Sequence, residues 1–171
     1  VHGRTVEQRY IGPSNWDFLR EVKEHVGDRV ILGSGDLFAA QDCLDMMAQT
    51  GVDGCTVARG AIGNPWIFAQ VRALANGEPL PQPPTIHEQR DVIREHFGLA
   101  EQLYGAERCG LLMRKFAVKY SAAHPHHEEL RQAFCRIKQP SDWEAVLDRW
   151  YGVDGPGQFP AREIHKVQAE S

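Results

Sequence analysis

Two short apolar runs interrupt the first 76 residues of the sequence. Residues 30–32 are wholly apolar and β-branched at two positions, and residues 54–58 form a second short run that includes Thr56 and Val57. Runs of this length, bounded by glycine, are typical of buried parallel strands. The sequence therefore predicts two strands in this part of the chain.

Helical spacing of apolar residues surrounds these two runs. One predicted helix begins with a cap at Ser14, a second covers residues 39–49 and buries Leu44 and Met47, and a third begins with Pro65 in its first turn. Strands that alternate with helices predict a parallel sheet with the helices packed outside it.

From residue 86 onwards the pattern is helical only. Four stretches of helical spacing lie between residues 86 and 150, and Ser141 with Glu144 predicts a capping box for the last of them. The four prolines within residues 77–84 cannot continue a helix or a central strand. We therefore predict an α/β part over residues 1–76, a linker over 77–85, a helical bundle over 86–151 and a flexible tail over 152–171.

Charge is distributed unevenly along the chain. The 171 residues have a formal net charge of −4, which excludes a uniformly basic nucleic-acid-binding protein. Residues 108–138 nevertheless hold seven Lys and Arg against two Glu, a local charge of +5. This local excess is compatible with a basic patch on the predicted bundle.

The spacing of the cysteines and the length of the apolar runs predict where in the cell the protein is found. The four cysteines include no Cys-x-x-Cys pair, so we expect reduced thiols in a cytoplasmic protein. The apolar runs are too short to span a membrane, and the polar first residues do not resemble a signal peptide. Because residue 1 is Val and the sequence opens inside a motif, we expect the chain to be the C-terminal part of a longer protein.

Glycines follow both predicted strands, at residues 33–36 and 58–60. Ligands bind at the carboxyl ends of parallel strands, where glycines let backbone N–H groups approach a phosphate and Arg59 adds a positive charge. These residues predict a phosphate site, with ordinary strand-to-helix turns as the alternative. His2 and Arg4 would follow a third strand, as a pair that contacts a cofactor or as a surface pair.

Three segments carry a resemblance to one family. They are His2-Gly3-Arg4-Thr5 with its continuation to Trp16, Ile31-Leu32-Gly33-Ser34-Gly35-Asp36, and Val57-Ala58-Arg59-Gly60-Ala61-Ile62-Gly63-Asn64-Pro65-Trp66-Ile67-Phe68. In this order and spacing they resemble the segments at strands six, seven and eight of the tRNA-dihydrouridine synthases, in particular those of the bacterial B-type branch. Looser similarity continues to about residue 150.

The resemblance implies a fold, an activity and a cofactor site. The fold would be α/β followed by all-α, with the part of a TIM (β/α)8 barrel around strands 6–8 followed by a small helical bundle. The activity would be FMN-dependent reduction of a tRNA uridine to dihydrouridine, with NADPH as the reductant. The residues at the family's FMN positions are His2, Ser34, Gly35, Asp36, Ala58 and Arg59. Ser34 stands where the family usually has Asn, and Ala58 where it usually has Gly.

No residue of this chain is predicted to be catalytic. The family's proton-donating Cys and its flavin-contacting Lys belong to segments that precede this sequence. Cys43 and Cys55 fall in a predicted helix and strand, where small buried thiols are common. The alternatives to a synthase are a non-catalytic module that binds RNA or phosphate, and another FMN-dependent barrel reductase.

A basic stripe is predicted on the bundle, formed by Arg108, Lys115 and Lys119, because both lysines fall within about 20° of Arg108 on a helical wheel. A merely solvated face is the alternative, but the resemblance implies a bundle that grips tRNA. The residues predicted to bind RNA are Arg4, Arg108, Arg114, Lys115 and Lys119, although Arg114 lies off the stripe. Residues 124–127 are expected to form an exposed loop that borders the RNA, without a metal ion.

Overall fold

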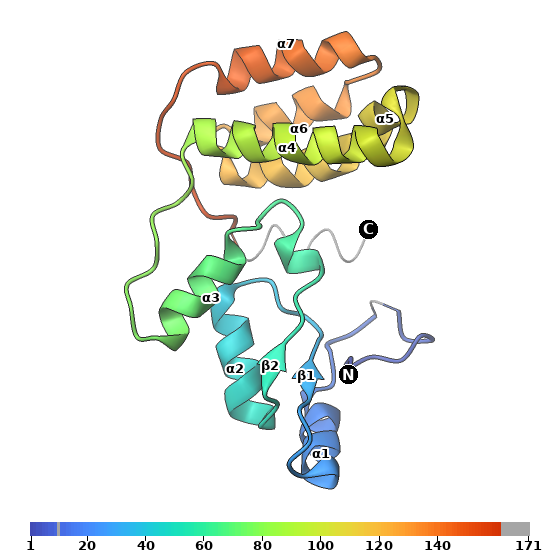
Figure 1. The fold of residues 1–171 in the computed structure, drawn as a ribbon, viewed down its shortest axis with the longest axis vertical. Helices are drawn as coiled ribbons and strands as arrows, with labels where there is room; N and C mark the ends of the chain where they lie inside the picture. Colours follow the sequence, from blue (N-terminus) through green and yellow to red (C-terminus); the bar gives the residue numbers. More distant parts are fainter. Residues whose placement is uncertain (10, 162–171) are drawn as a thin grey trace. The chain divides into compact units, whose positions relative to one another are not determined.

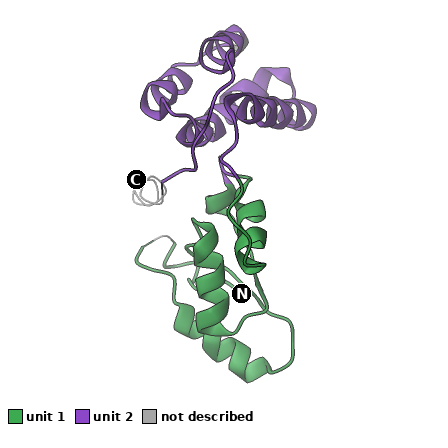
Figure 2. Ribbon diagram, turned by 90° about the vertical axis from the view of Figure 1, so that its left-hand side faces the viewer, with its two compact units in different colours: residues 1–61, 65–81, 162–171 green, residues 62–64, 82–161 purple. Residues whose placement is uncertain are grey.

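The first unit of the protein, residues 1–61 and 65–81, is built on a small parallel sheet (Figures 1 and 2). In the computed structural model, which describes residues 1–9 and 11–161, strand β1 (Leu32–Gly33) pairs in parallel with β2 (Gly54–Cys55). On the other side of β1, His2 forms a parallel bridge with Ser34. Three chain segments therefore run in the same direction, as the alternation of strands and helices predicts.

Helices connect and follow these segments: α1 (Trp16–Val26), α2 (Ala40–Thr50), the short 3-10 turn η1 (Arg59–Ala61) and α3 (Ile67–Ala75). The side chain of Asn15, and not that of Ser14, caps α1 by accepting a hydrogen bond from the Phe18 N–H at 3.0 Å. Helix α3 begins two residues after Pro65, because residues 65 and 66 form a turn before it.

The sheet is covered on one face only among the described residues. Gly33 faces the helices, and a Cβ atom there would lie 2.8 Å from Met46 Sδ. Val30 and Leu32 belong to the opposite face and are 76% and 50% exposed. Within the described residues, the helices therefore bury one side of this apolar run and leave the other side accessible.

Helix α2 buries a different face from the one predicted. Cys43 and Met46 lie in the core with Leu19, while Leu44 and Met47 are only half-buried. Apolar residues occupy positions 43, 44, 46 and 47, so helical spacing fits two neighbouring faces equally well. Packing against the neighbouring elements selects between them, and the sequence of the helix alone does not contain that choice.

The second unit, residues 62–64 and 82–161, is a helical bundle, as predicted. Its helices are α4 (Ile86–Tyr104), α5 (Ala106–Tyr120), the 3-10 turn η2 (Ser121–Ala123), α6 (His127–Cys135) and α7 (Pro140–Tyr151). Ile93, Met113, Phe134 and Trp143 are among the side chains buried in its core. Trp143 therefore packs inside the bundle, as expected from its spacing. No helix of the described part of the chain is long and apolar enough to cross a bilayer.

Helix α7 starts two residues earlier than the predicted capping box. Gln139 is its N-cap residue, and Asp142 Oδ2 accepts hydrogen bonds from the N–H groups of Lys138 (2.8 Å) and Gln139 (3.2 Å). An acidic side chain in the first turn satisfies N–H groups that have no partner inside the helix. Asp142, and not the predicted pair of Ser141 and Glu144, thus caps α7.

Residues 154–158 are held by hydrogen bonds, unlike the predicted flexible tail. The Ile86 N–H donates to the Gly155 carbonyl at 2.9 Å, and the His87 N–H donates to Asp154 Oδ1 at 3.0 Å. The Gln158 N–H donates to the carbonyl of Ala123 at 2.9 Å. The first N–H groups of α4 need acceptors, and this segment supplies them. The rest of the predicted tail, residues 162–171, lies outside the described residues.

Candidate functional site

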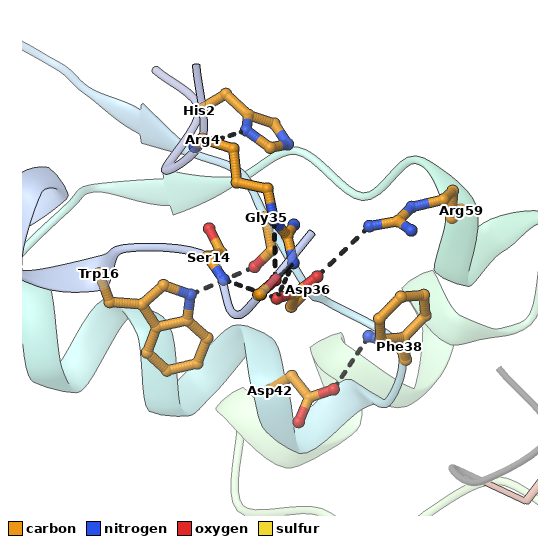
Figure 3. Close-up of polar contacts among 10 residues, drawn as sticks. His2, Arg4, Ser14, Trp16, Gly35, Asp36, Phe38, Asp42 and Arg59 are labelled. Carbon is orange, nitrogen blue, oxygen red and sulfur yellow. Dashed lines mark hydrogen bonds and ion pairs between the residues drawn. The ribbon is translucent and has the colours of Figure 1, made fainter. Parts of the chain in front are cut away.

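A small hollow lies where the three parallel segments end, and we refer to it as the strand-end hollow (Figure 3). It has a volume of about 30 Å³, and all six residues predicted to bind a cofactor line it. They are His2, Ser34, Gly35, Asp36, Ala58 and Arg59, and the other lining residues are Leu37, Phe38 and Thr56. Residues distant in sequence meet here because the carboxyl ends of parallel strands lie at one edge of a sheet.

Asp36 is the centre of the polar contacts at this hollow (Figure 3). Its Oδ2 accepts hydrogen bonds from Arg4 Nη2 at 2.6 Å and from the Ser14 N–H at 2.8 Å, while its Oδ1 accepts from Arg59 Nη2 at 3.3 Å. Burial alone would raise the pKa of Asp36. The hydrogen bonds from Arg4 and Ser14 and the charges of Arg4 and Arg59 outweigh burial and hold that pKa below its ordinary value.

The turn that carries Asp36 is tightly constrained. The backbone φ angle is +57° at Asp36 and +129° at Gly35. Residues other than Gly, Asn and Asp rarely adopt a positive φ. A Cβ atom at Gly35 would collide with Ser14 Oγ. The indole N–H of Trp16 donates to the Gly35 carbonyl at 3.2 Å, so the first turn of α1 also holds this turn.

The hollow favours an anion. Arg59 and Asp36 line the hollow with opposite charges, and the guanidinium of Arg4, which pairs with Asp36 without lining the hollow, brings the sum of the three charges to +1. Among the described residues, the backbone N–H groups of Gly35 and Ala58 donate to no protein acceptor. Backbone N–H groups at glycine-containing turns beside a positive side chain are a typical arrangement for binding phosphate.

His2 adds a hydrogen-bond donor at the edge of the hollow. Its Nδ1 accepts a hydrogen bond from the Arg4 N–H at 3.0 Å. A neutral histidine whose Nδ1 is an acceptor carries its proton on Nε2. Because His2 is exposed, Nε2–H is accessible to a ligand.

Three residues support the hollow in a role that the sequence does not predict for them. Ser14 contributes its N–H to Asp36, and the ring of Phe38 lies 5.1 Å from the Arg59 guanidinium carbon. Asp42 Oδ2 accepts the N–H groups of Phe38 and Ala39, both at 2.9 Å, and so caps α2. An acidic residue three positions after the N-cap is a recognisable signal in the sequence, whereas the contacts of Ser14 and Phe38 depend on the fold.

The predicted RNA-binding residues separate into two groups. Arg108 and Lys115 are exposed on α5 and form no ion pair within the described part of the chain, and Lys119 is half-buried. The side chain of Arg4 is only 4% exposed and serves Asp36 and the Gly12 carbonyl, contrary to the expected RNA contact. Arg114 Nη1 donates to the carbonyl of Ile137 at 3.2 Å near the end of α6, a second departure from the expectation.

Of residues 124–127, Pro125 and His126 are exposed in a turn before α6, in line with the predicted exposed loop, and His127 is half-buried at the start of α6. His124 differs from the prediction. His124 is buried, its Nε2 lies 2.9 Å from the Trp150 carbonyl, and its Nδ1 accepts the His126 N–H. Burial lowers the pKa of His124, and the charge of His126 lowers it further, whereas the hydrogen bond to Trp150 opposes this shift. No group of three or more His, Cys, Asp or Glu side chains suited to a metal ion occurs among residues 1–9 and 11–161.

The two cysteines of the first unit lie in its packed interior. Cys43 is buried in the core, and the half-buried Cys55 thiol donates to the Cys43 carbonyl at 3.4 Å. The neighbouring Cys55 thiol and burial raise the pKa of Cys43. A thiol with a raised pKa is a weak nucleophile, in agreement with a structural role for this residue.

Comparison with known proteins gives one consistent result. The model of the family described as "Dihydrouridine synthase (Dus)" matches residues 1–151. A protein of Mycobacterium tuberculosis (strain CDC 1551 / Oshkosh) named "Probable tRNA-dihydrouridine synthase" is 38% identical over 160 residues, which cover 94% of this chain and 40% of that protein. One of the same name from Rickettsia typhi is 37% identical over 87% of this chain and 44% of its own length. "tRNA-dihydrouridine synthase B" of Pasteurella multocida is 28% identical over 90% of this chain and 46% of its own length.

The chain thus spans less than half the length of these three relatives. The family match includes the strand-end hollow and the helices as far as the end of α7. Since the match extends over 151 of the 171 residues, the chain belongs to the dihydrouridine synthase family.

Proposed function

We propose that this chain contributes the phosphate-binding part of an FMN site, and a tRNA-binding bundle, to an enzyme that reduces uridine to dihydrouridine in tRNA with NADPH. The observation that carries the proposal is the strand-end hollow, where Arg59 and backbone N–H groups that have no protein acceptor among the described residues meet at the ends of parallel segments. The names of the relatives support the reaction and the tRNA substrate.

The residues of the hollow fit the phosphate group of FMN. Gly35 and Ala58 offer backbone N–H groups, and Arg59 offers a charge-assisted hydrogen bond. Ser34 keeps a hydrogen-bonding side chain at the position where the family usually has Asn. Ala58 is exposed, and its N–H donates to no protein acceptor among the described residues. The summed charge of +1 on Arg4, Arg59 and Asp36 favours a phosphate over a neutral group.

The part of the chain around the hollow binds and orients the cofactor in this proposal. Bound FMN supplies hydride transfer, the chemistry that reduces the uracil ring. His2 Nε2–H would be available to donate a hydrogen bond to the bound flavin, and Arg59 would hold its phosphate group. The proton donor for the uracil ring is not among the residues proposed here, because Cys43 and Cys55 lie in the packed interior of the first unit.

The first unit is proposed to be the part of a (β/α)8 barrel around strands 6–8. The parallel order of the His2 segment, β1 and β2, with helices on one face, supports this assignment. In such a barrel, the accessible face with Val30 and Leu32 would face the barrel interior, which is filled by apolar side chains.

The bundle is proposed to contact tRNA through α5. Arg108 and Lys115 of the basic stripe are exposed without ion pairs among the described residues, so phosphate groups of RNA can approach them. Arg4 and Arg114 are left out of the proposal because other groups of the protein engage them.

The flavin content of the purified protein tests the proposed cofactor. The complete gene product, expressed in cells that make FMN, should retain one flavin that is released by heat and identified as FMN by mass spectrometry. Added NADPH should bleach the visible absorption of the bound flavin as it is reduced. A purified, folded product without flavin would contradict the proposal and favour a non-catalytic RNA- or phosphate-binding module. A product that carries FAD in place of FMN would contradict the proposed FMN site.

A further inference from the structure

The two carboxylate oxygens of Asp36 accept hydrogen bonds from two different parts of the chain (Figure 3). Oδ2 accepts from Arg4 Nη2 and from the Ser14 N–H, which both belong to the segment before α1. Oδ1 accepts from Arg59 Nη2, which belongs to the strand end after β2. The carboxylate is therefore fixed on one side and presents a charged acceptor to Arg59 on the other.

The contacts of Asp36 Oδ2 fix the position of the carboxylate. The side chain of Arg4 is 4% exposed, and its Nε and Nη2 also donate to the Gly12 carbonyl at 3.1 and 2.5 Å. The Asp36 backbone adopts φ +57°, and a Cβ atom at the preceding Gly35 would collide with Ser14 Oγ. The carboxylate of Asp36 cannot turn toward a ligand without breaking its contacts with Arg4 and Ser14.

The Arg59 side faces the hollow. The Arg59 guanidinium lies over the ring of Phe38, and 28% of its side chain is exposed. A guanidinium has five N–H donors, so Arg59 can hold Asp36 and donate to an anion at the same time. A carboxylate repels a phosphate, so a direct contact between Asp36 and a phosphate would oppose binding.

We propose that Asp36 is a positioning residue, which holds the Arg59 guanidinium in place for a phosphate group and makes no contact with the phosphate itself. The proposal rests on the phosphate site proposed above. It replaces the direct cofactor contact of Asp36 that the sequence predicts. The competing explanation is a purely structural role, in which Asp36 only holds the turn after β1.

Asp36→Asn separates these two roles. Asn tolerates a positive φ and still accepts a hydrogen bond from the Ser14 N–H, but it lacks the charge that orders Arg59. Dissociation constants for FMN and riboflavin are measured by fluorescence with the complete gene product freed of flavin. We expect the preference for FMN over riboflavin to fall about tenfold, as is typical when a group that orients a ligand-binding side chain is lost. In an Arg59→Ala background, the same substitution should change the preference by less than about twofold.

Asp53→Asn is the matched control. Asp53 also accepts from a cationic side chain, Lys23 Nζ at 2.8 Å, and from a backbone N–H, that of Ile31 at 2.7 Å, but it does not line the hollow. This variant should keep the FMN preference of the unmodified protein. Equal weakening of both flavins by Asp36→Asn would overturn the proposal in favour of the structural role. A stronger preference for FMN would overturn it as well, because Asp36 would then compete with the phosphate for Arg59.

A second measurement needs neither a variant nor a flavin, so it holds even if Asp36→Asn does not fold. Side-chain ¹⁵N relaxation of Arg59 Nε–H, in buffer without phosphate, reports whether the guanidinium is ordered before a ligand binds. We expect an order parameter above about 0.6, and a lower value would overturn the proposal. If the unmodified protein binds FMN and riboflavin equally well, the phosphate site itself fails, while the order of Arg59 still tests the role of Asp36.

Discussion

Replacing Arg59 with Ala removes one positive charge from the strand-end hollow without removing the support of Asp36. Oδ2 of Asp36 keeps Arg4 and Ser14 as partners, and the carboxylate is 26% exposed, so water can replace Arg59 at Oδ1. The Arg59–Asp36 pair is long at 3.3 Å and partly exposed, so its loss should cost at most about 1 kcal/mol of folding stability. A hydrogen bond from a charged donor to phosphate contributes about 1.5–3 kcal/mol, which corresponds to about 10- to 150-fold in affinity.

The assay compares FMN with riboflavin, which lacks the phosphate. In a fluorescence titration, we expect Arg59→Ala to weaken the binding of FMN by this factor and the binding of riboflavin by less than about twofold. Arg20→Ala serves as the control, since Arg20 forms a surface pair with Asp17 at 2.7 Å and does not line the hollow. An equal loss of affinity for both flavins, together with a lower melting temperature, would refute the assignment of Arg59 to the phosphate.

Three further predictions concern the bundle. Changing Arg108 and Lys115 to Gln should make the slope of log affinity for tRNA against log salt concentration shallower by roughly 0.7–0.9 per residue. The control variant Arg114→Gln should lower the melting temperature and leave this slope unchanged. Equal slopes for all variants would count against the basic stripe. Because burial lowers the pKa of His124, the unfolded chain takes up a proton more readily, so the bundle should lose stability as the pH falls below about 6.5. Melting curves between pH 5 and 8 should show a smaller loss for His124→Gln, and an identical loss would exclude His124 as the cause. Gly98→Ala should stabilise the bundle by about 0.5–1 kcal/mol in urea titrations, since Gly98 lies inside α4 and nothing lies within 4 Å of a Cβ atom there, and a loss of stability would contradict this.

The order of helices and strands could be predicted because it depends on local spacing. The three parallel segments, the helices of the first unit and the four-helix pattern after residue 86 all agree with the sequence. The strand ends that line the hollow could be predicted from the glycines and Arg59 that follow the two apolar runs, because residues that follow parallel strands meet at one sheet edge. The full set of six residues rests on the resemblance to the family, and their role toward a cofactor stays a prediction.

The roles of individual side chains could not be predicted in the same way. Arg4 carries the positive charge expected of an RNA-binding residue. Its side chain is nevertheless buried, because Asp36, 32 positions later, accepts its hydrogen bond. Arg114 is directed to the Ile137 carbonyl, 23 positions away, by the packing of α5 against α6. Leu44 and Met47 fit a helical face as well as Cys43 and Met46 do, and only contacts with other elements select the buried pair. Such choices depend on tertiary contacts that spacing along the chain does not contain.

The most direct test of the central claim is the dihydrouridine content of tRNA. Unmodified tRNA transcripts are incubated with the complete gene product, FMN and NADPH, digested to nucleosides and analysed by mass spectrometry. The account predicts a nucleoside two hydrogen atoms heavier than uridine, formed only when NADPH is present and reduced when Arg59→Ala is assayed at limiting FMN. A flavin-loaded, folded protein that forms no dihydrouridine in tRNA would contradict it.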